Sequence, residues 1–159
     1  MRFDKVRELF RYEDGRLYNK VSRGNRALAG AVAGSVRDDG YSAVCIDYKM
    51  YLIHRMVWLM HNEELPECID HIDRDTTNNK IENLRECSRS ENNWNMDVSS
   101  HNTSGVKGVH YVKRTGKWQG HIKVHGKKLH VGTHTTRDLA EEAVIGKRLE
   151  LHKEFACNG

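Results

Sequence analysis

The amino-acid sequence predicts an α+β protein, and the pattern of each of its parts supports that class. Short apolar runs between turn signals indicate a β-rich N-terminal segment over residues 1–52. Residues 53–98 have the order helix, strand, polar loop, strand and helix, which predicts a small mixed core. A polar linker, residues 99–104, leads to residues 105–157, which predict a three-stranded antiparallel sheet packed on one helix.

The N-terminal segment reads as short strands joined by turns. Leu17 and Tyr18 follow a turn at residues 13–15, and the Asp39-Gly40 pair precedes the β-rich run at residues 41–46.

The central part combines a helix with two short strands. Residues 54–62 have helical apolar spacing, and Pro66, the only proline, ends the connection that follows. Residues 68–72 and 84–87 read as strands on either side of a loop rich in Asp, Asn and Thr. Ser88 and Glu91 fit a capping box, which starts a helix at about residue 89.

The C-terminal part predicts strands at residues 106–113, 118–125 and 128–134, then a helix capped by Thr135 or Thr136 and running to about residue 153. Strand alternation separates two faces. One face carries Trp118, Gly120, Ile122 and Val124, and the other Gln119, His121, Lys123 and His125. We expect the helix to cover the first face and leave the second, basic face open.

Charge is distributed unevenly along the chain. Residues 1–100 contain 15 Lys and Arg against 17 Asp and Glu, whereas residues 101–159 contain 11 against 5. Residues 101–136 hold seven basic residues, six histidines and no acid. Such a single-sign patch suits a polyanion, although a merely soluble basic domain has the same composition.

Composition also excludes some classes of protein. No apolar run approaches the roughly 20 residues that span a bilayer, and residues 1–10 lack the apolar core of a signal peptide. We therefore expect a cytoplasmic protein that has no membrane partner. The cysteines form no CxxC pair, so we expect thiols, with a Cys68–Cys87 disulfide or metal site as the alternative.

Residues 70–93 carry the chemistry. Phosphodiester hydrolysis needs a base for the attacking water and a cation that stabilises the charged phosphorus. His71 could take the proton, while Asp70 and Asn92 could offer carboxylate and amide oxygens to Mg²⁺. Asn83 could bond the loop backbone and fix His71. In a regular strand Asp70 and His71 point to opposite sides, so they serve one site only if the strand ends or twists there.

Each of these residues also has an ordinary structural explanation. Asn-rich loops usually satisfy turns, as we expect of Asn78 and Asn79, and a single histidine such as His71 is more often simply hydrogen-bonded. The order of the whole set is what favours a site: an Asp-His pair, an Asn-Leu pair before the return strand, and an Asn after the capping box.

This ordered set resembles the HNH endonucleases, in particular the small phage and intron-encoded homing-type enzymes. The matching elements, within about residues 41–98, are His54-Arg55, Asp70-His71-Ile72-Asp73, Asn78-Asn79, Glu82-Asn83-Leu84 and Ser90-Glu91-Asn92. The resemblance implies a ββα-metal fold around one Mg²⁺ or Mn²⁺. It also implies that His71 is the general base, that Asp70 and Asn92 are metal ligands, and that Asn83 braces the loop.

Two positions depart from the family pattern. Many members have His where this chain has Asn92, and the Asn variant, found among homing-type nicking enzymes, suits Mg²⁺ better than zinc. Arg74 stands where a glycine is usual, so it would either contact DNA phosphate or alter the turn.

Residues 105–155 resemble the DNA-binding domain of plant ethylene-response factors, which also occurs fused to phage HNH nucleases. The matching residues are Gly105-Val-Lys-Gly-Val109, Gly116-Lys-Trp118, Gly132-Thr133 and Asp138-Leu-Ala-Glu-Glu-Ala143. The resemblance implies a sheet that lies in the DNA major groove. The candidates for DNA contact are His110, Arg114, Gln119, His121, Lys123 and His130. Alternation favours a core position for Trp118.

These observations favour a divalent-metal-dependent DNA endonuclease of the homing type, in which the C-terminal sheet recognises the sequence. One site per chain favours a monomer that nicks double-stranded DNA, with a dimer as the alternative. We expect no small-molecule cofactor, and a location in the bacterial host cytoplasm if the chain is phage-encoded. The competing hypotheses are a DNA-binding regulator with a vestigial nuclease fold and an RNA-binding protein.

Overall fold

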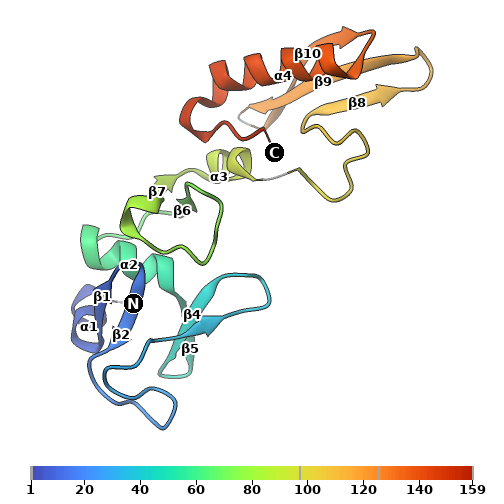
Figure 1. Cartoon of the computed structure of the whole chain (residues 1–159). Helices are drawn as coiled ribbons and strands as arrows, with labels where there is room; N and C mark the ends of the chain where they lie inside the picture. Colours follow the sequence, from blue (N-terminus) through green and yellow to red (C-terminus); the bar gives the residue numbers. More distant parts are fainter. Residues whose placement is uncertain (1, 97, 125, 159) are drawn as a thin grey trace. The chain divides into compact units, whose positions relative to one another are not determined.

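The computed structural model describes residues 2–96, 98–124 and 126–158, and the chain forms two compact units, Met1–Cys87 and Ser88–Gly159 (Figure 1). This division does not test the limits that the sequence predicts for three parts, residues 1–52, 53–98 and 105–157, and these limits stay predictions. The mixed content of helices and small antiparallel sheets confirms the predicted α+β class.

The first unit is built from short elements. In chain order these are α1 (Phe3–Leu9), β1 (Phe10–Glu13), β2 (Arg16–Asn19), β3 (Ser35–Val36), β4 (Ser42–Ile46), β5 (Lys49–Leu52), α2 (Ile53–Asn62), β6 (Cys68–His71), the 3-10 helix η1 (Ile81–Asn83) and β7 (Leu84–Cys87). They form a β1–β2 hairpin, an antiparallel sheet in the order β3-β4-β5, and a β6–β7 hairpin. The N-terminal part is therefore β-rich, as the sequence predicts.

Helix α1 has no counterpart among the elements predicted from the sequence. Its Val6 and Leu9 are buried together with Phe10 at the start of β1. A helix of seven residues offers too few positions for a helical period to stand out from the sequence. Met56 and Val57 of α2 join the same apolar cluster, so the two helices share one core.

The β6–β7 hairpin confirms the predicted strands to within one residue. β6 ends at His71, because the turn that follows has begun at Ile72. In the register of the pair, Asp70 lies opposite Arg85 and Cys68 lies opposite Cys87. Both cysteines are in the thiol form, as expected.

The second unit contains the remaining elements. They are α3 (Arg89–Asn95), β8 (Val109–Val112), β9 (Lys117–Val124), β10 (Lys127–His134), α4 (Arg137–His152) and the 3-10 helix η2 (Lys153–Phe155). The sheet has the order β10-β9-β8, and α4 packs on one face of it (Figure 1). The predicted caps are confirmed: Ser88 and Glu91 form a capping box on α3, and the Thr136 side chain caps α4.

The helix-facing side of the sheet matches the predicted alternation. Ile122 is buried with Val144 of α4, and Trp118 packs against this cluster, which confirms its core position. A side chain at Gly120 would come 2.6 Å from Val144, so the glycine allows α4 to approach.

The first strand of this sheet is shorter than predicted. β8 begins at Val109 rather than at residue 106, because Gly108 has a φ of 83° and ends a turn there. A Cβ at Gly108 would lie 2.3 Å from the carbonyl oxygen of His121, so only glycine fits. His125, predicted on the basic face, lies outside the described residues.

Among the residues that the structure describes, no helix combines the length and the apolar character that crossing a membrane would require.

Candidate functional site

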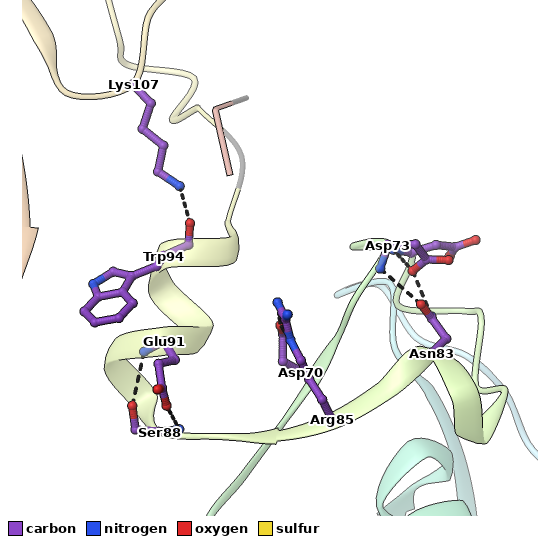
Figure 2. Close-up of polar contacts among 9 residues, drawn as sticks. Asp70, Asp73, Asn83, Arg85, Ser88, Glu91, Trp94 and Lys107 are labelled. Atoms are coloured by element: carbon purple, nitrogen blue, oxygen red, sulfur yellow. Dashed lines mark hydrogen bonds and ion pairs between the residues drawn. The ribbon is translucent and has the colours of Figure 1, made fainter. Parts of the chain in front are cut away.

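Asp70 is a buried carboxylate with a defined partner. Its side chain is only 7% exposed, and its Oδ2 accepts hydrogen bonds from Nε and Nη2 of Arg85 at 2.9 and 2.7 Å (Figure 2). Asp70 and Arg85 are directly opposed in the register of β6 and β7, so the hairpin itself brings them together. A charge-assisted pair of this kind fixes the orientation of the carboxylate.

His71, the next residue, lies in an aromatic pocket. Its ring packs on that of His54 in a T-shaped arrangement with centroids 5.1 Å apart, and the centroid of the Tyr41 ring lies 6.0 Å away. The Nε2 atom of His71 lies 3.2 Å from Oδ1 of Asn79, in the loop after β6. The imidazole is 4% exposed and is therefore held on several sides before any substrate arrives.

His54 differs from a usual surface histidine. It is 5% exposed, and its Nδ1 has no hydrogen-bond partner among the described residues. Burial lowers the pKa of His54 to about 3, with the charges of His71 and Arg55 adding to the effect. His54 is therefore neutral near pH 7, and its ring lies beside that of His71.

The loop after β6 is braced by Asn83, the first residue before the return strand. Its Oδ1 accepts from the backbone N–H of Asp73, while its Nδ2 donates to Asp73 Oδ1 at 2.8 Å and to the carbonyl of Asn78 at 2.9 Å (Figure 2). Burial alone would raise the pKa of Asp73, but hydrogen bonds from Asn78 and Asn83 outweigh it, so this pKa lies below the usual range. Asn83 thus bonds the loop backbone, as anticipated, whereas the side chain that contacts the His71 ring is that of Asn79.

Arg74 stands in this loop in a left-handed conformation. Its φ is 70°, and its backbone N–H bonds the carbonyl of His71, which closes the turn. A glycine would adopt this conformation without strain, which explains why the family pattern has one there. Contact of Arg74 with DNA phosphate stays a prediction.

Asn92 lies on α3, in the turn that follows the capping box. Its backbone N–H donates to the carbonyl of Ser88 at 3.0 Å, and its side chain is half-buried. One residue, Ser88, separates β7 from α3 in the chain, and the division between the units falls just before it. Asp70 and His71 therefore belong to the first unit and Asn92 to the second.

The donor types of the predicted ligands decide which ion they suit. Within the described residues, no three His, Cys, Asp or Glu side chains converge to hold a metal ion, so a closed zinc site is not supported. Mg²⁺ binds oxygen, often with one or two carboxylates, and leaves positions for phosphate and water. A carboxylate, as in Asp70, and an amide oxygen, as in Asn92, are both donor types that Mg²⁺ accepts.

The open face of the C-terminal sheet gathers most of the predicted DNA contacts. The register pairs Lys123 of β9 with Lys128 of β10, and His121 with His130. Gln119 lies between His110 of β8 and Thr133 of β10. Arg114 is exposed in the turn between β8 and β9. The structure therefore brings the predicted side chains to three adjacent strands and one connecting turn.

Three histidines form a row across this face. The rings of His110 and His121 stack at 4.9 Å, and those of His121 and His130 lie 5.0 Å apart. Thr133 Oγ1 lies 3.2 Å from His130 Nε2 and orients that ring. Burial lowers the pKa of His121 to about 4, and the positive charge of Lys128 and the neighbouring histidines add to this.

Three contacts around Asp70 and His71 have no local signal in the sequence. The Asn-rich loop predicts only a turn role for Asn79, and nothing near Arg85 or His54 in the sequence predicts their contacts with Asp70 and His71. The partner of Asp70 follows from strand register, which pairs residues 15 positions apart in the sequence.

Comparison with known proteins agrees with this geometry. A model of the HNH endonuclease family matches residues 51–94, which include α2, the β6–β7 hairpin and most of α3. Protein 3.8 of Escherichia phage T7 is 37% identical over 113 residues, which cover 69% of this chain and 91% of the phage protein. No solved structure matches the chain. The chain therefore carries an HNH endonuclease domain and belongs to the same family as protein 3.8 of Escherichia phage T7.

Proposed function

We propose that the chain is a divalent-metal-dependent endonuclease that hydrolyses phosphodiester bonds of double-stranded DNA. The observation that carries the proposal is the pair of buried, oriented side chains at the end of β6. Asp70 is held by Arg85, and His71 by Asn79 and two aromatic neighbours. The HNH family match covers this hairpin and supports DNA as the substrate.

His71 is the proposed general base. The amide oxygen of Asn79 accepts from Nε2, so the neutral imidazole carries its proton on Nε2 and its lone pair on Nδ1. In the reaction, Nδ1 takes the proton of the attacking water, whose oxygen forms the new bond to phosphorus. The P–O bond to the leaving group breaks, and the leaving oxygen takes a proton from solvent.

Asp70 and Asn92 are the proposed ligands of one Mg²⁺ or Mn²⁺. When bound, the ion would supply positive charge that stabilises the pentavalent phosphorus. Arg85 fixes the direction of the Asp70 carboxylate. Asn83 holds the loop that carries Asn79, and so it supports His71 indirectly.

The C-terminal sheet is the proposed recognition surface. Its open face combines Lys123 and Lys128, which suit phosphate, with Gln119, which suits adenine in the major groove. One proposed site per chain supports nicking by a monomer. Asn92 at the third motif position supports the homing type.

A second candidate is a DNA-binding regulator whose nuclease fold is vestigial. One observation favours it: Nε and Nη2 of Arg85 both donate to Asp70 Oδ2, so this carboxylate already has a positively charged partner within the fold. In this alternative Asp70 would be part of the scaffold, and the C-terminal sheet alone would account for the function.

The test separates binding from cleavage. Wild type, His71→Ala and the matched control His101→Ala, at an exposed histidine, are compared on end-labelled duplex fragments of phage and host DNA. We expect His71→Ala to lose cleavage by about 100-fold or more while its affinity for DNA stays unchanged. Cleavage by His71→Ala at the wild-type rate, or DNA binding by wild type without any cleavage, would favour the regulator.

A further inference from the structure

Helix α3, which carries Asn92, is held to the rest of the second unit by contacts at its C-terminal end. The ammonium group of Lys107, from the loop before β8, donates to the carbonyl of Trp94 at 2.8 Å (Figure 2). It also donates to the carbonyl of Met96. These carbonyls lie at the end of α3, where backbone acceptors have no partner within the helix. A cation there also suits the negative end of the helix dipole.

The indole of Trp94 provides a second attachment. It stacks flat on the imidazole of His152, the last residue of α4, with ring centroids 4.0 Å apart and an interplanar angle of 0°. His152 is buried, and its Nε2 lies 3.3 Å from the carbonyl of Lys123 in β9. Burial lowers the pKa of His152, so the neutral ring lies between α3 and the sheet.

A buried arginine links the two attachments. Arg148 of α4 is 2% exposed, and its Nη2 donates to the backbone carbonyl of Lys107 at 2.6 Å. Its Nη1 donates to Asn158 near the C-terminus at 2.6 Å. The residue that holds the end of α3 is therefore itself fixed to α4, and α4 packs on the sheet.

We propose that Trp94, Lys107 and His152 are positioning residues for Asn92, and that they make α3 and the recognition sheet move as one body. This inference rests on the proposed function, because it assigns Asn92 to the reaction. It goes further by stating that DNA captured on the sheet fixes the helix bearing a proposed ligand, so that recognition and assembly of the site are coupled. Asn92 itself lies on the same short helix, two residues before Trp94.

The first test separates rate from binding. Trp94→Ala and Lys107→Met are compared with Lys147→Met, a control on α4 whose side chain pairs with Glu150. We expect single-turnover cleavage at saturating DNA and Mg²⁺ to fall about 10- to 100-fold in the first two variants, because displacement of a reacting group by about 1 Å can cost that much. DNA affinity, measured in EDTA, is expected to change less than twofold. An unchanged rate, or a parallel loss of affinity and rate, would overturn the proposal.

A conservative variant checks that stacking is the cause. His152→Phe keeps a flat ring against Trp94, whereas His152→Ala removes it. We expect the Phe variant to retain at least half of the wild-type rate and the Ala variant to lose about 10-fold or more. Equal rates in the two variants would contradict a role for the stack.

A readout without metal or cleavage keeps this inference separate from the proposed nuclease activity. Hydrogen exchange of the backbone amides of residues 91–96 is measured in EDTA with and without duplex DNA. We expect DNA to slow exchange in wild type about 10-fold, and to have less than a twofold effect in the Trp94→Ala/Lys107→Met double variant. Equal protection of wild type and double variant would mean that DNA touches α3 directly, and would overturn the coupling even if the enzyme cleaves.

Discussion

The charged side chains to which we assign a function differ between the two units in burial and in pairing. In the first unit the proposed catalytic carboxylate, Asp70, is buried and already paired with Arg85. In the second unit Lys123 and Lys128 are exposed on the sheet, and residues 101–136 contain no carboxylate that could neutralise them. A reaction centre benefits from side chains oriented before the substrate arrives, whereas a DNA surface needs cations whose counterion is the phosphate. The comparison therefore supports the proposal that the first unit supplies Asp70 and His71 to the reaction, and that the second supplies the cations that capture DNA together with Asn92.

The largest expected effect is the loss of stability when Arg85, the partner of the buried Asp70, is removed. Arg85→Met would leave the buried Asp70 charge without its main partner, and we expect the free energy of unfolding in urea to fall by about 3–5 kcal/mol. The matched control is Arg37→Met, whose partner Asp39 is 46% exposed against 7% for Asp70. That surface pair should contribute less than about 1 kcal/mol. Equal losses in the two variants would show that the Asp70 pair is not a buried pair.

Low pH should destabilise the folded chain, because His54 is buried in the first unit. The pKa of His54 is about 3 in the folded chain and about 6.5 when unfolded, so between these values the unfolded state binds one more proton. Stability therefore falls as the pH falls from 6.5 towards 3, by up to about 1.4 kcal/mol per pH unit. Urea unfolding of wild type and His54→Gln across this range measures it. A slope that is unchanged by the substitution would contradict the assignment.

Substitution of a lysine on the C-terminal sheet tests whether that sheet captures DNA. Lys123→Met is expected to weaken DNA binding about 10-fold at low salt and to reduce the slope of log K against log salt by about one, because one phosphate contact is lost. Lys5→Met, which removes an exposed cation of the first unit paired with Asp47, is the control and should leave the slope unchanged. If both variants behave alike, capture of DNA is not confined to the C-terminal sheet.

The smallest expected effect concerns the turn after β6. Arg74→Gly relieves a left-handed residue with a φ of 70°, and we expect stability to change by no more than about 1 kcal/mol, in the stabilising direction. Thermal unfolding gives the stability, and DNA affinity measured on the same variant shows whether Arg74 also contacts phosphate. A destabilised variant would mean that the arginine side chain, rather than the turn, is what the loop needs.

Local signals in the sequence predicted the elements that depend on local interactions. The capping box of Ser88 and Glu91 and the strand Leu84–Cys87 need only neighbouring residues, and both are present as predicted. Contacts set by register or by loop conformation could not be read in this way. Asp70 meets Arg85 only because β6 and β7 pair in one register, and Asn79 reaches His71 only because the loop folds back.

The start of β8 likewise depends on contacts that the sequence does not show. The apolar pattern from residue 106 suggested a longer strand, but Gly108 adopts a positive φ and packs against the carbonyl of His121. Which glycines form turns depends on what lies beside them in three dimensions, and a single sequence does not contain that information.

The most direct test of the account is nicking of supercoiled plasmids that carry a library of phage and host DNA fragments. Wild type and Asp70→Asn are each incubated with Mg²⁺, Mn²⁺ or EDTA, and the products are separated on agarose. The account predicts relaxed circles with wild type and either metal, and none with EDTA or with Asp70→Asn. If wild type binds the same plasmids tightly and leaves them supercoiled with every metal, the nuclease assignment is contradicted and the chain acts as a DNA-binding regulator.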